Sequence, residues 1–568
     1  MKEELVSHIK IILEEFGIEN PKVSLDIPTR TNMGDYSTSG AMAYAKKLDR
    51  KPLDLANEIK DILDSKHIPH VAKIEVVMPG FINFFFDADY YSQNVERILT
   101  QENKYGKNKT HAGEKIIVEY TVTNVLKPLH IGHLMGNVIG ESLSNIIHAT
   151  GAEVKRNNYQ GDSGLHIAKT IWGMRKLGGK VEGSLHDKVE YIGKAYALGA
   201  NTFETDEVVQ KEIKDINKNI FEKTDLDAVD LYMWARQVSL DHFEELYAKL
   251  GTKFDYYFFE SEVTEDALRI VHEFLKKGLF EESDGAIVFH GEKYDKSLHT
   301  RVFVNSQGIP MYEAKDIAHA FRKYKTYPFD KAIIITANEQ DGYFKVVLEA
   351  LRHIDAVLGN KIQHLSHGIL KLTDGKMSSR KGNVITGESL IEDVENLVME
   401  KVKDREWTDE KKSIVATMVG VAAIKYSILR QAVGGDIIFD FDKSLSFEGD
   451  SGPYLQYATV RANSLLEKAD GVVKMSENLP AGWQTTNLER LLEQYPDVVL
   501  RAGELYAPHY IVTYLVELAG EFNSFYASHK IIDTEDKTSP YRLALTRAFV
   551  TVMISGLDLL GIKVPDSM

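Results

Sequence analysis

The sequence predicts a multidomain α/β protein with a doubly wound parallel-sheet core, a smaller α/β domain before it and an all-helical domain after it. Three observations support this prediction. The chain has 568 residues, which is too long for one hydrophobic core. In its middle part, apolar segments of strand length alternate with helical patterns. From about residue 388 onward, the apolar residues recur at helical spacing.

Composition excludes several classes of protein. Hydrophobic residues make up 43% and charged residues 27%, as in soluble globular proteins, and we expect no membrane partner because no apolar run reaches about 18 residues. The charged, amphipathic start MKEELVSHIK is no targeting segment, so a cytoplasmic location is expected. The absence of cysteine excludes disulfides and thiolate zinc sites. The net charge of −16 argues against indiscriminate binding to DNA, yet it allows a local basic surface.

Residues 1–110 are predicted to form the first domain, a separate α/β unit. Leu5, Ile9, Ile12, Leu13 and Phe16 form a helical stripe that ends at Gly17. A second helix and the apolar stretch KIEVVMPGFINFFF follow. The polar run QENKYGKNKTHAGEK is expected to be the linker to the next domain.

The core is predicted over residues 111–386, and its first feature is a turn between a strand and a helix. An apolar strand at Lys115–Val122 precedes the run PLHIGHLMGN, and a helix follows that should stop at Gly151. His130, Gly132 and His133 therefore lie where free backbone N–H groups and the helix dipole suit a nucleotide phosphate. Gly132 would let a purine or ribose lie against the backbone.

Three further segments complete the core. A charged helical insertion at about 179–260 is expected to be a solvated face, and the second half restarts with AIVFHG. Lys331–Ala337 is apolar enough to be a central parallel strand. The run KMSSRKGN, at 376–383, combines cations, serines and Gly382 and fits a loop that embraces phosphates, although a basic surface loop has the same composition.

The rest of the chain is predicted to be helical, with a first region at 387–450 and a second at 451–568. Tyr457 and Arg461 lie four residues apart and therefore share a helix face. An aromatic ring beside a guanidinium suits stacking on an unpaired base. A core tyrosine and a surface arginine fit the same pattern equally well.

HIGH followed far downstream by a KMSKS-like loop resembles the class I aminoacyl-tRNA synthetases. The segments VEYTVTNVLKPLHIGHL, GDSG, MYEAKDIAHA and GPYLQYATVRA are similar to the arginyl-tRNA synthetase family, and the resemblance covers nearly the whole chain. It implies that L-arginine reacts with ATP to give arginyl-adenylate and is then passed to the terminal adenosine of the cognate arginine tRNA. It also implies that Mg²⁺ travels with ATP, that no zinc is needed, that activation needs tRNA and that the protein is a monomer.

The resemblance assigns a role to each domain and to named residues. The domain at 1–110 would contact the corner of tRNA, 387–450 its stem and 451–568 its anticodon. The implied residues are His130, His133, Lys376, Lys381 and secondarily Lys127 for catalysis; His130, Gly132, His133, Met377, Ser378 and Ser379 for ATP; Glu119, Asn124, Tyr312, Asp316 and Gln340 for arginine; and Phe81, Asn83, Tyr457 and Arg461 for tRNA. Carboxylates from two elements would bind the guanidinium, which has five N–H donors, and would discriminate against neutral side chains of the same shape.

Alternatives remain open at this point. Apart from the resemblance, the two histidines could be a metal pair or core residues, Glu119 and Asp316 could be caps or surface charges, and Phe81 and Asn83 could be a core and a turn residue. Ser379 stands where the commonest loop has its second lysine, which leaves the division of work between Arg380 and Lys381 open. Rival functions are a synthetase for lysine or cysteine, a catalytically silent tRNA-binding paralogue and a small-molecule nucleotidylyltransferase.

Overall fold

The computed structural model describes residues 1–28, 33–373 and 386–568. The chain divides into two compact units, each built from separate stretches of sequence. Unit 1 contains residues 1–105, 461–496 and 517–555, and unit 2 contains residues 106–460, 497–516 and 556–568.

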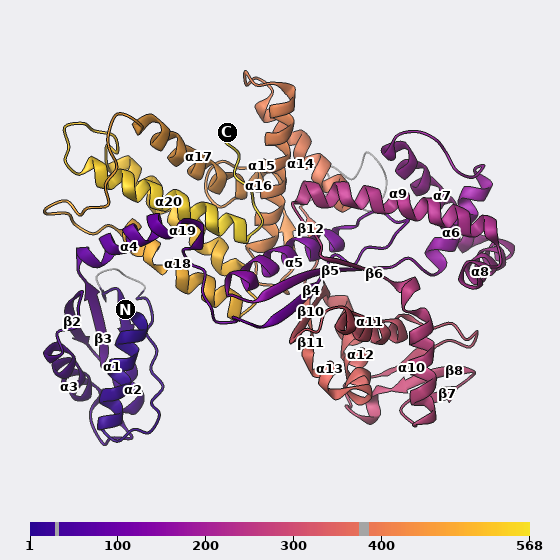
Figure 1. The fold of residues 1–568 in the computed structure, drawn as a ribbon, viewed down its shortest axis with the longest axis horizontal. Coiled ribbons are helices and arrows are strands. Elements are labelled where there is room, and N and C mark those ends of the chain that lie inside the picture. Colours follow the sequence, from indigo (N-terminus) through magenta and orange to yellow (C-terminus); the bar gives the residue numbers. More distant parts are fainter. Residues whose placement is uncertain (29–32, 374–385) are drawn as a thin grey trace. The chain divides into compact units, whose positions relative to one another are not determined.

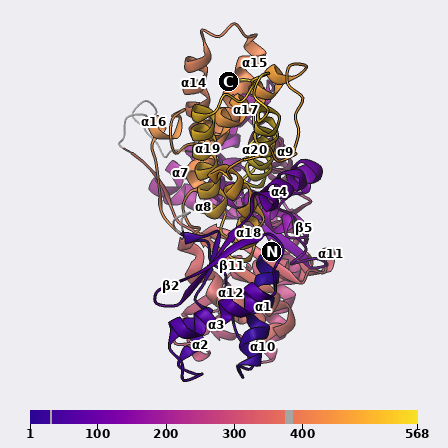
Figure 2. The same ribbon diagram turned by 90° about the vertical axis from the view of Figure 1, so that its left-hand side faces the viewer.

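Unit 1 begins with a small α/β layer. Its antiparallel sheet has the strand order β1–β3–β2, and Figures 1 and 2 show the first three helices gathered beside it. Leu5, Ile9, Ile12 and Leu13 of the first helix are buried, as their helical spacing predicts. The elements are α1 (Lys2–Glu15), β1 (Tyr36–Thr38), α2 (Gly40–Ala45), α3 (Pro52–Ser65), β2 (Val71–Val77), β3 (Phe81–Phe86) and α4 (Ala88–Gln101).

The C-terminal helices supply residues to both units. Within unit 1, Glu493 accepts a hydrogen bond of 2.7 Å from the hydroxyl of Tyr90, and the hydroxyl of Tyr105 donates to the carbonyl of Leu492 at 3.0 Å. The helices are α17 (Gly452–Ala469), α18 (Asn487–Glu504), α19 (His509–Ser528) and α20 (Ser539–Leu559).

Unit 2 is built on a five-stranded parallel sheet, which confirms the predicted doubly wound core. The strand order is β11–β10–β4–β5–β6, so the chain starts at the centre, runs to one edge and then returns to the other side of β4. Figure 1 shows α5 on one side of this sheet and α11, α12 and α13 on the other. The elements are β4 (Lys115–Glu119), α5 (Ile131–Ala149), β5 (Glu153–Gln160), β6 (Tyr256–Phe259), α11 (Tyr312–Thr326), β10 (Lys331–Ala337), α12 (Asp341–Ile354), α13 (Ala356–Lys361) and β11 (Ile362–His367).

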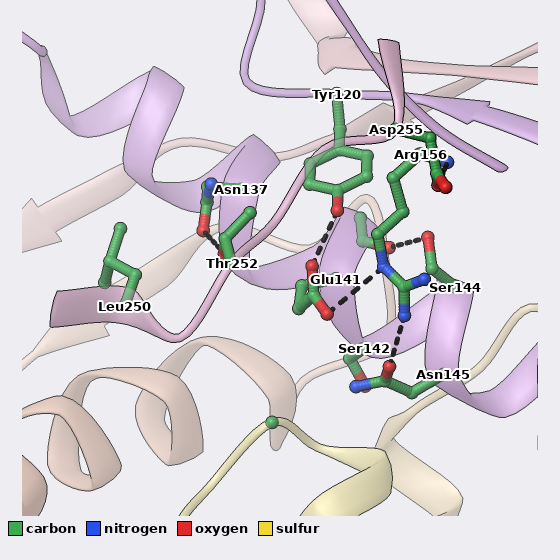
Figure 3. A network of polar contacts seen from close by, with 12 residues as sticks. Tyr120, Asn137, Glu141, Ser142, Ser144, Asn145, Arg156, Leu250, Thr252 and Asp255 are labelled. Carbon is green, nitrogen blue, oxygen red and sulfur yellow. Dashed lines mark hydrogen bonds and ion pairs between the residues drawn. The ribbon is translucent and has the colours of Figure 1, made fainter. Parts of the chain in front are cut away.

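Helix α5 packs unusually close to the central strand. A Cβ atom at Gly140 would lie 2.2 Å from Cγ of Tyr120, so only glycine fits at this crossing. The next residue, Glu141, accepts hydrogen bonds from the hydroxyl of Tyr120 at 2.6 Å and from Nε of Arg156 at 3.3 Å (Figure 3). These contacts fix the helix against both β4 and β5.

The remaining elements of unit 2 surround the sheet. The insertion is helical, as predicted, and β7–β9 form a separate antiparallel sheet. These elements are α6 (Leu165–Lys176), α7 (Leu185–Thr205), α8 (Glu207–Glu222), α9 (Leu226–Leu250), α10 (Thr264–Lys276), β7 (Glu281–Ser283), β8 (Ala286–His290), β9 (Thr300–Val304), β12 (Leu370–Leu372), α14 (Gly387–Val402), α15 (Asp409–Leu429), β13 (Ile437–Phe439) and α16 (Phe441–Ser444); short 3₁₀ turns lie at Glu102–Lys104, Glu260–Glu262, Gly291–Lys293 and Asn338–Gln340.

Helix α15 is the one helix of the described residues that is long and apolar enough to cross a membrane. Its most apolar window is 72% buried inside the protein, and it packs against α14 and α5. These contacts make it a core helix of unit 2.

Two expectations about local structure were wrong. The strand predicted to reach Val122 ends at Glu119, because Thr121 and Val122 adopt positive φ angles that a strand does not allow. AIVFHG does not restart the parallel sheet, because β8 pairs with β7 and β9 in the small antiparallel sheet instead.

Candidate active site

The carboxyl ends of the parallel strands surround one cavity of about 580 Å³. Its position beside β4, where the chain order of the sheet reverses, is the usual place for a ligand in an open α/β fold. All the predicted catalytic, nucleotide and amino-acid residues that the structure describes line it, namely Glu119, Asn124, Lys127, His130, Gly132, His133, Tyr312, Asp316 and Gln340. Lys376, Met377, Ser378, Ser379 and Lys381 lie outside the described residues.

His130 and His133 cap the first turn of α5 reciprocally. Nδ1 of His130 accepts from the backbone N–H of His133, and Nδ1 of His133 accepts from that of His130, each at 3.3 Å. Burial lowers the pKa of both imidazoles, and the cation of Lys127 adds to this effect. Because a neutral ring whose Nδ1 accepts must carry its proton on Nε2, both histidines offer Nε2–H donors.

Gly132 has a local role as well. The two imidazole rings stack with their centroids 3.4 Å apart, and a Cβ atom at Gly132 would lie 3.0 Å from Cε1 of His130. Any other residue would therefore press on the ring of His130, so Gly132 leaves room both for this ring and for a ligand.

His367 is a third imidazole of the cavity that sequence reasoning missed. It ends β11, is buried, and donates Nδ1–H to the carbonyl of Gly368 at 2.8 Å, so its Nε2 is an acceptor. Burial lowers its pKa, which keeps the ring neutral. Its strand, IQHLSH, alternates apolar and polar residues only weakly, so the sequence offered no clear signal for this histidine.

Most carboxylates that line the cavity form an ion pair with a basic side chain of the protein. Glu119 is buried, and its Oε2 accepts from Nε2 of His319 at 2.6 Å, from Nζ of Lys323 at 2.9 Å and from the amide of Asn157. Burial alone would raise the pKa of Glu119, but Lys323 and His319 lower it to about 2. This carboxylate is therefore ionised, and Lys323 offsets part of its charge.

Two more carboxylates are paired in the same way. Nζ of Lys315 lies 3.2 Å from Oε2 of Glu260, and Nη1 of Arg301 lies 3.0 Å from Oε1 of Glu313. Burial nevertheless raises the pKa of Glu260. Glu260, Glu313 and Arg301 line the cavity, and neither pair was foreseen from the sequence.

Asp316 differs from these three carboxylates. Among the residues that the structure describes, no cation forms an ion pair with it, and its Oδ2 accepts a hydrogen bond of 2.5 Å from the hydroxyl of Tyr343. Burial raises the pKa of Asp316 to about 7, and the nearby charges of Glu119 and Glu260 contribute, while the bond from Tyr343 opposes the rise. Apart from the exposed Glu339, Asp316 is therefore the cavity carboxylate that a cationic ligand would stabilise. Tyr343 had been given no role from the sequence.

Asn124 reaches the cavity from the loop after β4. Asn124 forms an isolated parallel β-bridge with Gly161. A Cβ atom added at Gly161 would lie 2.2 Å from Oδ1 of Asn124. Tyr312 and Gln340 also line the cavity, and both are exposed. Over the described part of the chain, no group of three or more histidine, aspartate or glutamate residues could hold a metal ion.

The four predicted RNA-facing residues have different surroundings. Phe81, at the start of β3, is 38% exposed, whereas Asn83 is buried and accepts a hydrogen bond of 2.7 Å from the hydroxyl of Ser37. Asn83 therefore joins β3 to β1 rather than facing solvent. On α17, Tyr457 is exposed, and the guanidinium of Arg461 lies 4.2 Å over the ring of Tyr526.

Comparison with known proteins covers the entire chain. Residues 94–441 match the catalytic domain of class I tRNA synthetases (R), residues 455–568 the DALR anticodon binding domain, and residues 2–86 the arginyl tRNA synthetase N-terminal domain. The arginine–tRNA ligases of Halothermothrix orenii and Streptococcus mutans are 32% and 31% identical, over 100% and 99% of this chain and 99% and 100% of theirs. The arginyl-tRNA synthetase structure from Thermus thermophilus has a TM-score of 0.80 at 25% identity and 100% coverage of both chains. The family matches and the arrangement of the cavity agree, and the chain belongs to the arginyl-tRNA synthetases of class I.

Proposed function

We propose that this chain performs its family's reaction, the ATP-dependent attachment of L-arginine to its cognate tRNA, with Asp316 as the residue that selects the amino acid. One observation carries this assignment. Among the cavity carboxylates that are at least partly buried, Asp316 is the one with no ion pair in the described part of the chain, while Glu119, Glu260 and Glu313 have theirs; Glu339, the other carboxylate without one there, is exposed. A guanidinium would supply the missing positive charge and would bond to the carboxylate through paired N–H donors.

Glu119 lines the same cavity and supports this site. Its charge is present at working pH because its pKa is about 2, and it contributes to the raised pKa of Asp316, although Lys323 offsets part of this effect. A neutral side chain of similar shape, such as that of citrulline, would leave Asp316 without a counterion and would therefore be rejected.

The first step needs alignment more than proton transfer. The carboxylate of arginine attacks the α-phosphorus of ATP, the bond to the pyrophosphate oxygen breaks, and arginyl-adenylate remains. The Nε2–H groups of His130 and His133 and the free N–H groups at the start of α5 are placed to donate to phosphate oxygens on which charge grows. Lys127 would add a cation, Gly132 would face the adenosine, and Mg²⁺ would accompany the phosphates.

The loop at 376–383 completes the proposed nucleotide site. Lys376 and Lys381 would neutralise the departing pyrophosphate, and Met377, Ser378 and Ser379 would contact ATP, as the family pattern implies. In the second step, a ribose hydroxyl of the terminal adenosine of tRNA attacks the carbonyl carbon of the adenylate, and AMP leaves. By similarity to class I enzymes, the 2′-hydroxyl is the attacking group.

Exchanging Gly161 for alanine tests the placement of Asn124, which together with Gln340 and Tyr312 is proposed to orient the amino acid. The new methyl group would need the space of Oδ1 of Asn124, so the amide must turn away. We expect the KM for arginine to rise by about tenfold, the cost of one or two lost hydrogen bonds, while the KM for ATP stays within twofold. ATP–pyrophosphate exchange measures both constants, and an unchanged KM for arginine would refute the assignment of Asn124.

The proposed partner surfaces lie outside the cavity. Phe81 is assigned to the corner of tRNA, and Tyr457 and Arg461 to its anticodon arm, since an exposed aromatic ring favours stacking on unpaired bases. We also propose that the protein acts as a monomer in the cytoplasm.

The decisive experiment is amino-acid-dependent ATP–pyrophosphate exchange with all standard amino acids, with and without bulk tRNA. Exchange with arginine alone, and only when tRNA is present, is expected. Exchange with lysine or another amino acid would leave the class I chemistry intact and reject Asp316 as the selector of arginine. Exchange with arginine in the absence of tRNA would reject the proposed requirement for tRNA.

A further inference from the structure

The 121–126 loop, which joins β4 to the HIGH turn, has a strained backbone. Thr121, Val122 and Leu126 have φ angles of +74°, +50° and +64°. They are three of the eleven non-glycine residues with positive φ in the described part of the chain, and the two β-branched ones are both here. β-branched residues clash in this region, so such a conformation persists only where the surrounding structure holds it.

This loop forms part of the wall of the cavity. Thr121, Val122 and Asn124 line it. The loop also pairs with the end of β5, because Val125 donates its N–H to the carbonyl of Gly161 at 3.0 Å and Gly161 donates to the carbonyl of Thr123 at 2.9 Å. The shape of the loop therefore decides where the amide of Asn124 lies in the cavity.

Helix α9 of the insertion holds the loop through two buried hydroxyl groups. Oγ of Ser239 accepts from the backbone N–H of Leu126 at 3.0 Å. The hydroxyl of Tyr247 lies 3.1 Å from Oγ1 of Thr123 and accepts from the amide of Asn158 at 3.0 Å. Either hydroxyl can be the donor of the bond between Tyr247 and Thr123, and this bond ties α9 to the loop in both cases. Burial raises the pKa of Tyr247 to about 12, so its hydroxyl stays protonated at working pH.

A second chain of contacts joins the end of α9 to the same loop. The hydroxyl of Thr252 donates to Oδ1 of Asn137 at 2.8 Å, as Figure 3 shows, and Nδ2 of Asn137 donates to Oγ1 of Thr121 at 3.0 Å. The carbonyl of Leu250, the last residue of α9, accepts from the buried Nζ of Lys425 at 2.7 Å. The helix that supports the loop is therefore itself fixed at its end.

We propose that α9 is a positioning element of the active site, in which Tyr247 and Ser239 hold the strained 121–126 loop so that Asn124 faces the bound amino acid. This inference rests on the proposed function, in which Asn124 contacts arginine. The strain is useful because a relaxed loop would turn Asn124 away from the cavity.

The first test compares two tyrosine-to-phenylalanine variants. Tyr247→Phe removes the hydroxyl that contacts the 121–126 loop. The control Tyr257→Phe, on β6, removes a hydroxyl that donates to Glu244 of α9 instead. Tyr247→Phe should raise the KM for arginine by about three- to tenfold in ATP–pyrophosphate exchange, with the KM for ATP within twofold, and the control should change neither. An unchanged KM for arginine, or an equal rise for ATP, would overturn the proposal.

Asn124→Ala separates this inference from the function on which it rests. If Asn124→Ala raises the KM for arginine and Tyr247→Phe does not, α9 has no positioning role and the proposed function stands. If neither variant changes it, the assignment of Asn124 itself fails.

The second test measures the strain without using activity. Val122→Ala and Val122→Gly both remove the side chain, but only glycine adopts positive φ freely. In an unstrained loop, glycine is the less stable of the two because it gains more freedom on unfolding. We expect the reverse order here, with a higher thermal midpoint for Val122→Gly than for Val122→Ala. A midpoint for Val122→Gly at or below that of Val122→Ala would show that the loop is not strained.

Discussion

Replacing Asp316 with asparagine is expected to lower kcat/KM for arginine by about 1000-fold without destabilising the protein. The variant keeps the shape of the side chain and removes the charge that a guanidinium needs, and sites built around such a partner discriminate by factors of this size. The stability should not fall, because the wild-type carboxylate has no cation in an ion pair within the described structure. The measurements are ATP–pyrophosphate exchange at varied arginine and a thermal unfolding curve.

The raised pKa of Asp316 also predicts how the stability of the protein and its kcat/KM for arginine change with pH. The pKa of Asp316 is about 7 in the folded protein, above its ordinary value, so the folded state binds a proton more tightly than the unfolded state does. The carboxyl therefore costs stability progressively as pH rises from about 4 to about 7, and Asp316→Asn should remove this cost, which is on the order of 4 kcal/mol. Below pH 7, kcat/KM for arginine should fall in the wild type as Asp316 takes up its proton. The groups facing it are Glu119, Tyr159, Glu260, Lys323 and Tyr343.

Glu339→Gln is the matched control for this experiment. Glu339 lines the same cavity and is exposed, so its replacement removes the same charge away from the proposed guanidinium site. We expect its kcat/KM for arginine to stay within a few-fold of the wild type. If Asp316→Asn were no more harmful than Glu339→Gln, Asp316 could not be the selector.

Unlike Asp316→Asn, the variant Glu119→Gln should strongly destabilise the folded protein. Lys323 is 1% exposed, and Glu119 is the carboxylate to which it is paired, so the variant leaves an ammonium buried without a counterion. Breaking a buried pair in this way costs about 3–5 kcal/mol. The folded pKa of Glu119 lies near 2, below its ordinary value, so its contribution is present above about pH 4.5 and is lost as pH falls towards 2.

A second substitution distinguishes electrostatics from packing. Lys323→Met replaces the ammonium with an apolar side chain of similar length, so the double variant Glu119→Gln/Lys323→Met buries no unpaired charge. Its thermal midpoint is expected to lie above that of Glu119→Gln alone. If the double variant were as unstable as the single one, the loss would come from packing around β4 rather than from the unpaired charge.

The sequence predicted the components of the active site better than their arrangement. The turn at His130–His133, the helix after it and the strand at Lys331–Ala337 follow from apolar periodicity and from a glycine stop, both of which are local properties. The insertion was predicted only as a solvated face, because its charge hides the buried side of α9 that carries Ser239 and Tyr247. Its function depends on a loop more than one hundred residues earlier in the chain.

The sequence by itself determined the family, the doubly wound core and the set of candidate residues, because motifs and apolar periodicity are properties of short stretches of chain. Only the tertiary structure decided which of two carboxylates, Glu119 or Asp316, is paired with basic residues of the protein and which stays available for a ligand. Asp316, His319 and Lys323 share one face of α11, but the packing of that helix beside β4 assigns both bases to Glu119. Within the described residues, Asp316 accepts its hydrogen bond from the hydroxyl of Tyr343, on α12. The charge state of a buried group depends on neighbours that the fold brings together, and spacing along the chain does not specify them.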